Sequence, residues 1–428
     1  MGCAKNEVDS AHMAERLVQA GYSVVADPND ADAVIVNTCS FIQAATEESI
    51  EAVLDAAESD AVSARGALLI VAGCMPARYG DDLSAEFPEV SAFVPCADEE
   101  RIDEILDGLF EDERPAEPSG EGQLIRPNGE PSAYVKISDG CDRFCAYCSI
   151  PYIRGRYHSF SYEDIRAEVA KEIGRGAREI VLIAQDTGRW GADLTPPSSL
   201  AWLVSELACE FCDAWFRIMY IQPEGVTDEL IEAVAAHGNI CSYFDIPFQH
   251  VVPRILKAMN RKGDAQAYLG LLEKILGRIP DAALRTTLIA GFPGETDEDF
   301  DELCSFIEEA PLDYVGVFAY SREEGTRAYD LPDQVDDDEK AYRAQRLRDI
   351  ADGASATRIA QRIGTVEDVL VCGYEEDGQL YGRASCQAPD VDGVTFVDSG
   401  DVGDIIQVRI VDTLLYEMEG ELLDERCR

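Results

Sequence analysis

Three cysteines stand close together in the segment SDGCDRFCAYCSIPYIRGR, with the spacing C-x3-C-x2-C. Cys141, Cys145 and Cys148 directly follow a short β-branched run. Three thiolates on one loop can hold three irons of a cubane iron–sulfur cluster and leave the fourth iron free. A free iron can bind a small ligand, which suits catalysis better than electron storage. Zinc is the alternative, but zinc usually takes four protein ligands and no fourth partner is near in the sequence.

A second group of thiols is expected at the edge of a sheet. Cys39 follows AVIVNT and Cys74 follows ALLIVAG, so each comes just past a short apolar run typical of a buried parallel strand. Ligand sites of open α/β sheets lie at this carboxyl edge. Cys3 belongs to the same group if a strand precedes it.

The remaining cysteines carry less information. The chain has 14 cysteines, an unusual number for a reducing compartment, where metal binding or catalysis is the first explanation. Cys96 has no partner in spacing. Cys209 and Cys212 lie in a helical stretch with Trp202 and Phe211, and we expect this pair to face a core.

Residues 1–110 alternate strand and helix, which predicts an open α/β domain similar to Rossmann and flavodoxin folds. Two strands are expected at Ala33–Asn37 and Ala67–Gly73, with a helix at Gln43–Ala57 between them. Residues 111–131 are rich in Pro, Gly and Glu and predict a linker.

Residues 132–363 show a longer series of strands and helices, which predicts a curved parallel sheet, a partial (βα)6 barrel. A charged helix over Asp336–Ile363 ends this domain. The expected strands are Ala133–Ile137, Glu179–Ala184, Phe216–Tyr220, Tyr243–Ile246, Leu284–Ala290 and Tyr314–Ala319.

Residues 364–428 predict a small antiparallel β-barrel of OB-like type, because short strands and turns follow one another closely. The expected strands are Val366–Gly373, Leu380–Ser385, Val394–Val397, Ile405–Asp412 and Glu419–Leu422.

The charge balance is strongly acidic, with 36 Lys and Arg against 83 Asp and Glu, a net charge of −47. Such a surface repels phosphate backbones and attracts basic proteins; a general acidity of the source organism's proteins is the alternative. Residues 364–428 contain 16 acidic residues against four Arg and no Lys, so RNA binding by this barrel is not expected. No stretch reaches the ~20 apolar residues of a membrane helix and no secretory signal is visible, so we expect a cytoplasmic protein.

The cysteine loop, with Tyr147 before its last cysteine and the βα series after it, resembles the radical S-adenosylmethionine (SAM) superfamily. The resemblance implies that Cys141, Cys145 and Cys148 hold a 4Fe–4S cluster whose fourth iron binds SAM. Electron transfer then cleaves SAM to methionine and a 5′-deoxyadenosyl radical, which abstracts hydrogen from carbon.

The phrases GCAKNEVDS, NTCSFI and AGCMP resemble the front domain of the methylthiotransferases, a radical SAM family, and the resemblance extends over essentially the whole chain to a terminal TRAM barrel. It implies a second 4Fe–4S cluster on Cys3, Cys39 and Cys74. In the family a strand precedes the first Gly-Cys, whereas only Met1 precedes Gly2 here. We therefore expect that the reading frame begins upstream or that this sheet lacks a strand, and we favour the former.

One branch of the family modifies an aspartate of the twelfth small-subunit ribosomal protein, and the other an adenosine of transfer RNA. GCAKN, AQDTGRWG, EEGTRAY and APDVDGVTFV are similar to the first branch, whereas MYIQP at 219–223 departs from its Tyr-x-Tyr-Pro pattern. The acidic barrel favours a basic protein substrate independently. An iron–sulfur electron carrier or scaffold that binds basic proteins is a further alternative, against which two three-cysteine sites argue.

The resemblance implies the following chemistry. One SAM methylates sulfur held on the front cluster, and a second is cleaved to the radical. This radical takes a hydrogen from Cβ of the aspartate, and the carbon radical captures the methylated sulfur. An electron donor is therefore an implied partner.

Polar side chains and glycines at the strand ends are the candidates for SAM binding. For each, a polar cap on a strand end or an ordinary turn glycine is the alternative. These candidates are Tyr147, Gln185, Asp186, Arg217, Gln249, His250, Gly291 and Gly294.

Overall fold

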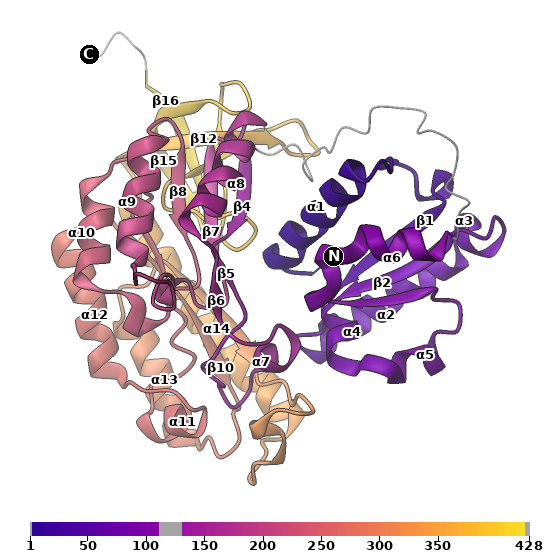
Figure 1. The fold of residues 1–428 in the computed structure, drawn as a ribbon. Coiled ribbons are helices and arrows are strands. Elements are labelled where there is room, and N and C mark those ends of the chain that lie inside the picture. The colour runs from indigo at the N-terminus through magenta and orange to yellow at the C-terminus, as the bar shows by residue number, and fades with distance from the viewer. Residues whose placement is uncertain (1, 111–130, 424–428) are drawn as a thin grey trace.

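The computed structural model describes residues 2–110 and 131–423. The expected linker at 111–131 falls almost wholly outside the described residues. Figure 1 shows three units in chain order: a front unit (α1 to α6), a central unit (β4 to α14) and a C-terminal barrel (β12 to β16). No helix among the described residues is long and apolar enough to cross a membrane.

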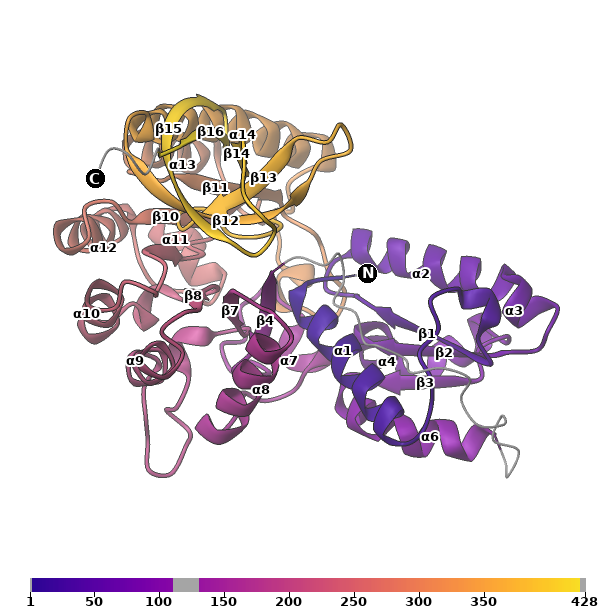
Figure 2. The same ribbon diagram turned by 90° about the horizontal axis from the view of Figure 1, so that it is seen from above.

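The front unit is a parallel sheet of order β1-β2-β3 covered on both faces by helices, as Figure 2 shows. Side chains of β2 alternate between the two faces: Ile70 packs with helices α1 and α6, and Leu69 packs with α2 and α4. This confirms the open α/β prediction. The bounds are α1 (Ala4–Gln19), β1 (Ala33–Thr38), α2 (Gln43–Glu58), α3 (Asp60–Ser63), β2 (Leu68–Gly73), α4 (Cys74–Tyr79), α5 (Leu83–Glu86), β3 (Ala92–Pro95) and α6 (Ile102–Leu109).

The central unit contains the six expected parallel strands in two three-stranded sheets, β4-β7-β8 and β9-β10-β11. An isolated parallel bridge between Phe216 and Ile240 joins the two sheets, so the curved partial barrel is confirmed. The strands are β4 (Ser132–Lys136), β7 (Glu179–Ile183), β8 (Trp215–Ile218), β9 (Tyr243–Asp245), β10 (Ala283–Ala290) and β11 (Tyr314–Ala319). A short antiparallel pair, β5 (Ser138–Asp139) and β6 (His158–Ser159), brackets the cysteine loop.

Six of the eight helices described in the central unit begin at Ser, Thr or Asp residues whose side chains accept a backbone N–H of the first turn, which stabilises helix starts. These caps are Ser161, Ser199, Thr227, Asp264, Thr296 and Asp336. The helices are α7 (Ile150–Ile153), α8 (Tyr162–Gly174), α9 (Leu200–Glu210), α10 (Asp228–Ala236), α11 (Pro253–Ala258), α12 (Ala265–Arg278), α13 (Asp297–Glu309) and α14 (Asp337–Ile359).

The C-terminal barrel closes in the order β12-β13-β14-β16-β15. One neighbour pair differs from the antiparallel expectation: β14 and β16 run parallel, because β16 returns beside β14 to close the barrel. The strands are β12 (Val366–Tyr374), β13 (Leu380–Ala384), β14 (Thr395–Val397), β15 (Ile405–Leu414) and β16 (Glu417–Leu422).

The barrel packs on the concave face of the central sheets. Val181 and Tyr243 share one apolar cluster with barrel residues such as Leu370 and Ala384. The opposite face of the sheets packs against the helices, through residues such as Ile180. The concave face is therefore closed at one end by the barrel.

Candidate functional site

The cysteine loop runs between β5 and α7. Cys141 is buried, Cys145 and Cys148 are partly buried, and burial raises the pKa of Cys141 and of Cys148, with the Cys145 thiol acting on both. The Cys141 N–H donates to the Gly155 carbonyl at 3.2 Å. The three thiols therefore lie on one loop whose backbone is held by hydrogen bonds.

A distant segment holds this loop in place. The Ala146 N–H donates to the Met259 carbonyl at 2.9 Å, and the Asn260 side-chain amide donates to the Arg143 carbonyl at 2.9 Å. Burial opposes the charge of Arg261, but Tyr147 and a hydrogen bond with Cys145 raise its pKa above the ordinary value. Sequence reasoning missed Asn260 and Arg261, because no motif connects them to a loop more than 100 residues earlier.

Two of the SAM candidates end β7 beside the cysteine loop. Gln185 has a buried side-chain oxygen with no hydrogen-bond partner among the described residues, so this atom is available to a ligand. Asp186 is 1% exposed and pairs with Arg143 at 2.6 Å, and burial raises the pKa of its carboxyl. This polar edge fits a zwitterionic ligand.

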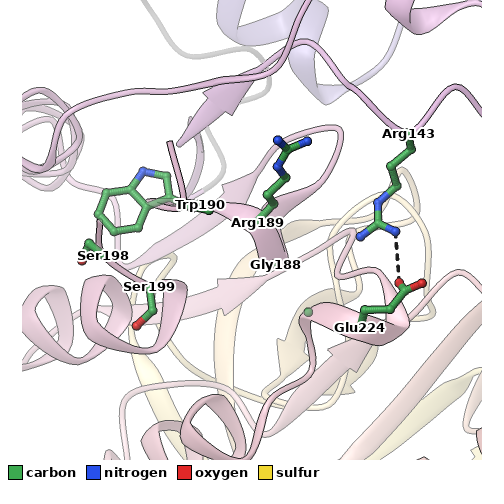
Figure 3. A pocket seen from close by; sticks show the side chains of 9 residues that line it. Arg143, Gly188, Arg189, Trp190, Ser198, Ser199 and Glu224 are labelled. Atoms are coloured by element: carbon green, nitrogen blue, oxygen red, sulfur yellow. Dashed lines mark hydrogen bonds and ion pairs between the residues drawn. The ribbon is translucent and has the colours of Figure 1, made fainter. Parts of the chain in front are cut away.

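A cavity of about 270 Å³ lies beside Asp186, between the segments that follow β7 and β8 (Figure 3). Arg143 and Glu224 form an ion pair at 3.0 Å at its edge. Gly188 and Gly225 touch, and a Cβ on either would lie 2.7 Å from the other's Cα. The other lining residues are Arg189, Trp190, Ala192, Ser198 and Ser199.

Tyr147 and Gln249 lie at other points of the same edge. Burial raises the pKa of Tyr147 well above its ordinary value, and the Cys145 charge adds to this. Gln249 has φ +72, and its backbone pairs with Thr287 and Ile289, each at 2.8 Å. Its side chain is partly buried, and its backbone, in the segment that follows β9, forms a parallel bridge with Leu288.

His250 is fully buried and both of its ring nitrogens contact protein groups. One accepts the Val252 N–H at 3.1 Å, and the other lies 3.3 Å from Glu295. Glu295 also accepts the Gly291 N–H at 3.0 Å. His250 therefore supports the turn that contains Gly291 and Gly294, whose φ angles of +76 and +80 favour glycine.

Arg217 lies elsewhere than expected. Its guanidinium is fully buried, 2.7 Å from Glu179 and 2.9 Å from the Ser385 carbonyl of the barrel. Arg383 of the barrel also pairs with Glu179, at 3.0 Å. Arg217 thus fixes the barrel to the concave face, because its side chain points toward the amino ends of the strands.

The front unit gathers four thiols at one edge of its sheet. Cys39, Cys74 and Cys96 each follow directly on a strand, and Cys3 lies at the first turn of α1. The Sγ atoms of Cys74 and Cys96 are 4.0 Å apart. Hydrogen bonds from Cys39 and Cys96 lower the pKa of Cys74, with Arg154 adding to the effect.

This geometry corrects two sequence-based expectations. Cys96 has a partner, which spacing could not reveal because β3 is short and ends in Pro95. Cys209 and Cys212 are exposed and do not face the core. Trp202, which is 42% exposed, lies seven residues before Cys209 on the same outer face of α9, so this apolar neighbour does not indicate a buried face.

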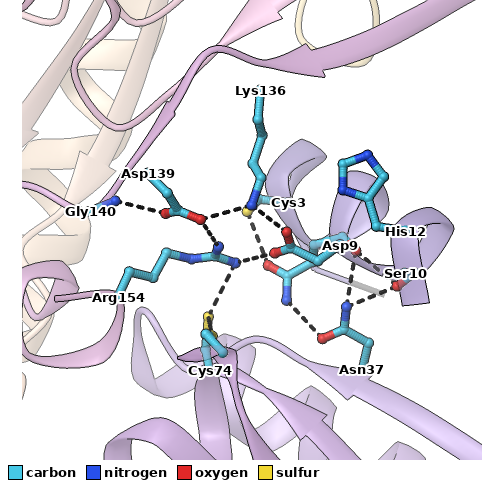
Figure 4. A network of polar contacts seen from close by, with 12 residues as sticks. Cys3, Asp9, Ser10, His12, Asn37, Cys74, Lys136, Asp139, Gly140 and Arg154 are labelled. Atoms are coloured by element: carbon cyan, nitrogen blue, oxygen red, sulfur yellow. Dashed lines mark hydrogen bonds and ion pairs between the residues drawn. The ribbon is translucent and has the colours of Figure 1, made fainter. Parts of the chain in front are cut away.

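A buried polar network joins the front thiols to the cysteine loop (Figure 4). Arg154, which directly follows α7, lies 3.9 Å from the Cys74 Sγ and 2.8 Å from Asp9 of α1. Its other nitrogen lies 3.2 Å from Asp139, which also pairs with Lys136 at 2.8 Å. Charges of both signs alternate here, as buried charges require.

The start of α1 meets the concave face of the central unit. The Lys5 ammonium lies 3.2 Å from the centroid of the Tyr220 ring, and burial lowers the pKa of Lys5 to about 8. The Cys3 charge acts on Lys5 and on Tyr220. Tyr220 belongs to the MYIQP segment, so this departure from the family pattern lies where the front unit meets the concave face.

The donor chemistry fits iron–sulfur clusters: thiols in two groups, an adjacent guanidinium and an orphaned amide oxygen. Among residues 2–110 and 131–423, no three His, Cys, Asp or Glu side chains could hold a single metal ion. The two groups of cysteines, one on the loop after β5 and one at the carboxyl edge of the front sheet, are the candidates for cluster binding.

The fold and the cysteine loop define a radical SAM protein with a front α/β unit and a TRAM barrel. Three family models match: the uncharacterized protein family UPF0004 at residues 1–95, the radical SAM superfamily at 135–307 and the TRAM domain at 363–423. The radical SAM methyltransferase TsrM from Kitasatospora setae has a similar fold, with TM-score 0.50, 12% identity, and coverage of 61% of this chain and 58% of that one.

Similarity to curated proteins extends over almost the whole chain. The ribosomal protein uS12 methylthiotransferase RimO of Geobacter sulfurreducens is 43% identical over 437 residues, covering 99% of this chain and 97% of the relative. The protein of that name from Clostridioides difficile is 41% identical over 435 residues, covering 99% and 98%. The chain belongs to this family of radical SAM methylthiotransferases, which use two 4Fe–4S clusters and SAM.

Proposed function

We propose that this chain transfers a methylthio group to Cβ of an aspartate in ribosomal protein uS12. The main support is that two sets of cysteines, one on the front unit and one on the central unit, lie beside the same buried interface. Arg154 contacts Cys74 of the front unit and follows the loop of Cys148. Relatives named for modification of uS12 match over almost the whole chain.

We assign the cofactors to named residues and units. Residues 1–110 form the front cluster domain, 132–363 the radical SAM domain after the linker 111–131, and 364–428 the TRAM domain. Cys3, Cys39 and Cys74 ligate the front cluster, and Cys141, Cys145 and Cys148 ligate the radical SAM cluster. When bound, the clusters and SAM supply the electron, the hydrogen-abstracting radical and the methylated sulfur.

The chain's own side chains bind and position these groups. Gln185 offers its unpaired oxygen to the polar end of SAM, and Asp186 holds Arg143 at the edge of the loop. Arg261 donates a hydrogen bond to the Cys145 sulfur and so helps to orient it. Gln249 and the Gly291–Gly294 turn are further candidates for SAM contacts, and His250 supports that turn through Glu295.

The charge of the chain supports a basic protein substrate. With 16 acidic residues and four Arg between Gly364 and Arg428, the barrel attracts a basic ribosomal protein and repels RNA. We propose that the protein acts in the cytoplasm, where uS12 is made, on free or ribosome-bound uS12. Reductive cleavage of SAM requires an electron donor as a further partner.

Mass spectrometry of ribosomal proteins and transfer RNA from a deletion strain tests the proposal. Loss of a methylthio group from uS12, with restoration by the wild-type gene, is expected. Loss from a transfer-RNA adenosine with uS12 unchanged would assign the chain to the other branch. Absence of 5′-deoxyadenosine from the reduced, cluster-loaded protein would support the carrier or scaffold alternative instead.

A further inference from the structure

The three strands of the front sheet all end in the same way. The parallel register aligns Thr38 with Gly73 and Gly73 with Pro95, and the next residue on each strand is a cysteine. Cys39, Cys74 and Cys96 therefore leave neighbouring strands at one level of the carboxyl edge. Because the sheet fixes the three backbones, these thiols are held together before any metal binds.

Contacts between the thiols agree with this alignment. The Cys74 Sγ lies centrally, 4.0 Å from the Cys96 Sγ, and hydrogen-bonds the Cys39 thiol. The Arg154 guanidinium, 3.9 Å from the Cys74 Sγ, favours the thiolate. Cys96 is partly buried, and the Arg154 charge acts on its thiol as well as on that of Cys74.

One oxygen of a buried carboxyl group near Cys96 has no hydrogen-bond partner among the described residues. Glu99, one turn further along the same short helix, is 8% exposed, and one of its oxygens has no hydrogen-bond partner among the described residues. The charges of Cys74 and Arg154 both act on Glu99. Among residues 2–110, Glu99 is the only residue with a buried side-chain nitrogen or oxygen atom that has no hydrogen-bond partner, and it lies one helical turn from Cys96.

Cys3 is held differently from the other three. It is exposed and precedes α1, and its thiol hydrogen-bonds Asn6 of the same helix at 3.2 Å. Its distance from the sheet edge depends on how α1 docks, through contacts such as that of the Asn6 amide with the Thr38 carbonyl at 3.0 Å. Of the four thiols, Cys3 is the one that no strand end positions.

We propose that Cys96 is a fourth protein ligand of the front cluster, forming with Cys39 and Cys74 a sheet-borne set that binds iron even without Cys3. The front site then has four thiolates, of which Cys3 and Cys96 are exchangeable. Departure of either one opens an iron to an external sulfur ligand, while the other keeps the cluster in place. This inference rests on the cofactors of the proposed function but not on uS12 as the substrate.

The test measures iron and does not require turnover. In a full-length background with Cys141→Ala, Cys145→Ala and Cys148→Ala, bound iron reports on the front site alone. After anaerobic reconstitution with ferrous iron and sulfide, Cys3→Ser should retain more than about half of the background iron, because three thiolates still hold a cluster. Adding Cys96→Ser should lower iron at least about fivefold, because two thiolates remain.

Controls separate ligation from folding. Cys3→Ser with Cys212→Ser, an exposed cysteine in the central unit, should match Cys3→Ser alone. Cys96→Ala should behave as Cys96→Ser does, and circular dichroism should show the same fold for all variants. Cys96→Ser alone should keep its iron but change the electron paramagnetic resonance spectrum of the reduced cluster.

Three results would overturn the inference. Cys3→Ser could lose its iron as completely as Cys74→Ser, or the double variant could keep as much iron as Cys3→Ser. Recovery of a Cys74–Cys96 disulfide from the cluster-loaded background would also contradict it. None of these results would affect the activity on uS12, which the deletion strain tests separately.

Discussion

At the scale of single residues, the two thiol groups are tuned by cations that the spacing of cysteines does not reveal. Arg261 reaches Cys145 from a segment after α11, and Arg154 reaches Cys74 across the interface between units. A guanidinium near a thiolate stabilises its negative charge and hence favours cluster binding. Each proposed cluster site thus includes a cation that is distant from its cysteines in sequence.

Cys145→Ala should remove the radical SAM cluster and leave the front cluster intact. Iron per chain should fall to about half, and 5′-deoxyadenosine production should cease, because two thiolates do not hold a cubane cluster. Iron analysis and chromatography of the SAM products measure both effects. Iron content equal to that of wild type would contradict the assignment.

Arg154→Ala should weaken the docking of the front unit. The side chain is 2% exposed, and its removal leaves Asp9 and Asp139 with less compensation, a loss of about 3 kcal/mol for a broken buried ion pair. Thermal unfolding of the cluster-free protein measures the effect. The matched control is Arg156→Ala, two residues away and 76% exposed, which should be nearly neutral. Equal stability of both variants would argue against the network.

At the scale of elements, the candidate site residues follow the carboxyl ends of the strands. The barrel binds near the amino ends, for example at Glu179. Glu179 opens β7 and lies between Arg217 of β8 and Arg383 of β13. Burial alone would raise the pKa of Glu179, but the two arginines lower it from 4.5 to about 2. This triad connects the central sheets to the barrel, as do the contacts of Tyr243 and Arg285 with Asp392 at 2.7 and 3.4 Å.

Acid should release the barrel through Glu179. Because the folded-state pKa of about 2 lies below the ordinary 4.5, its stabilisation is complete above pH 4.5 and is lost as the pH falls toward 2. The contribution is about 3 kcal/mol. Glu179→Gln should therefore be less stable than wild type at pH 7 and lose less stability on acidification.

Denaturant unfolding at pH 7 and near pH 3 measures this difference. Glu232→Gln is the control, because Glu232 forms an exposed pair with Arg278. A Glu179→Gln variant whose stability falls with pH as steeply as that of wild type would show that another group is responsible.

Most of the strands and their ends could be predicted from the sequence. Buried parallel strands carry β-branched runs, so the expected ends of β1, β2 and the six central strands lie within about two residues of the observed ones. β3 was missed because four residues ending in proline give little pattern. Arg217 was misplaced because a strand position alone does not show toward which end a long side chain extends.

At the scale of the whole molecule, one buried interface lies beside both cysteine groups, and the chain is strongly acidic, with a net charge of −47. Figures 1 and 2 show α1 on the side of the front unit that faces the central unit. Glu323 adds a contact there, accepting from Arg78 at 2.8 Å and from the Gln43 N–H at 2.7 Å. Composition predicted the charge, but not that the two cysteine groups would share a buried ionic network.

Charge reversal on the barrel should weaken binding of uS12. Glu375, Glu376 and Asp377 are exposed in the turn between β12 and β13, and their replacement by Lys removes long-range attraction for a basic protein. Binding measured at low salt should weaken, and the difference from wild type should shrink at high salt because ions screen it. Glu229→Lys and Glu232→Lys on the outer helix α10 are the control. Tighter binding of uS12 by the barrel variant would contradict the role of the acidic barrel.

Modification of an aspartate of uS12 by this chain can be observed in a reconstituted reaction. Protein with both clusters is incubated anaerobically with a reductant, SAM, a sulfur source and either purified uS12 or transfer RNA, and both are analysed by mass spectrometry. We expect uS12 to gain one methylthio group on an aspartate while 5′-deoxyadenosine is released. Methylthiolation of transfer RNA with uS12 unmodified would contradict it.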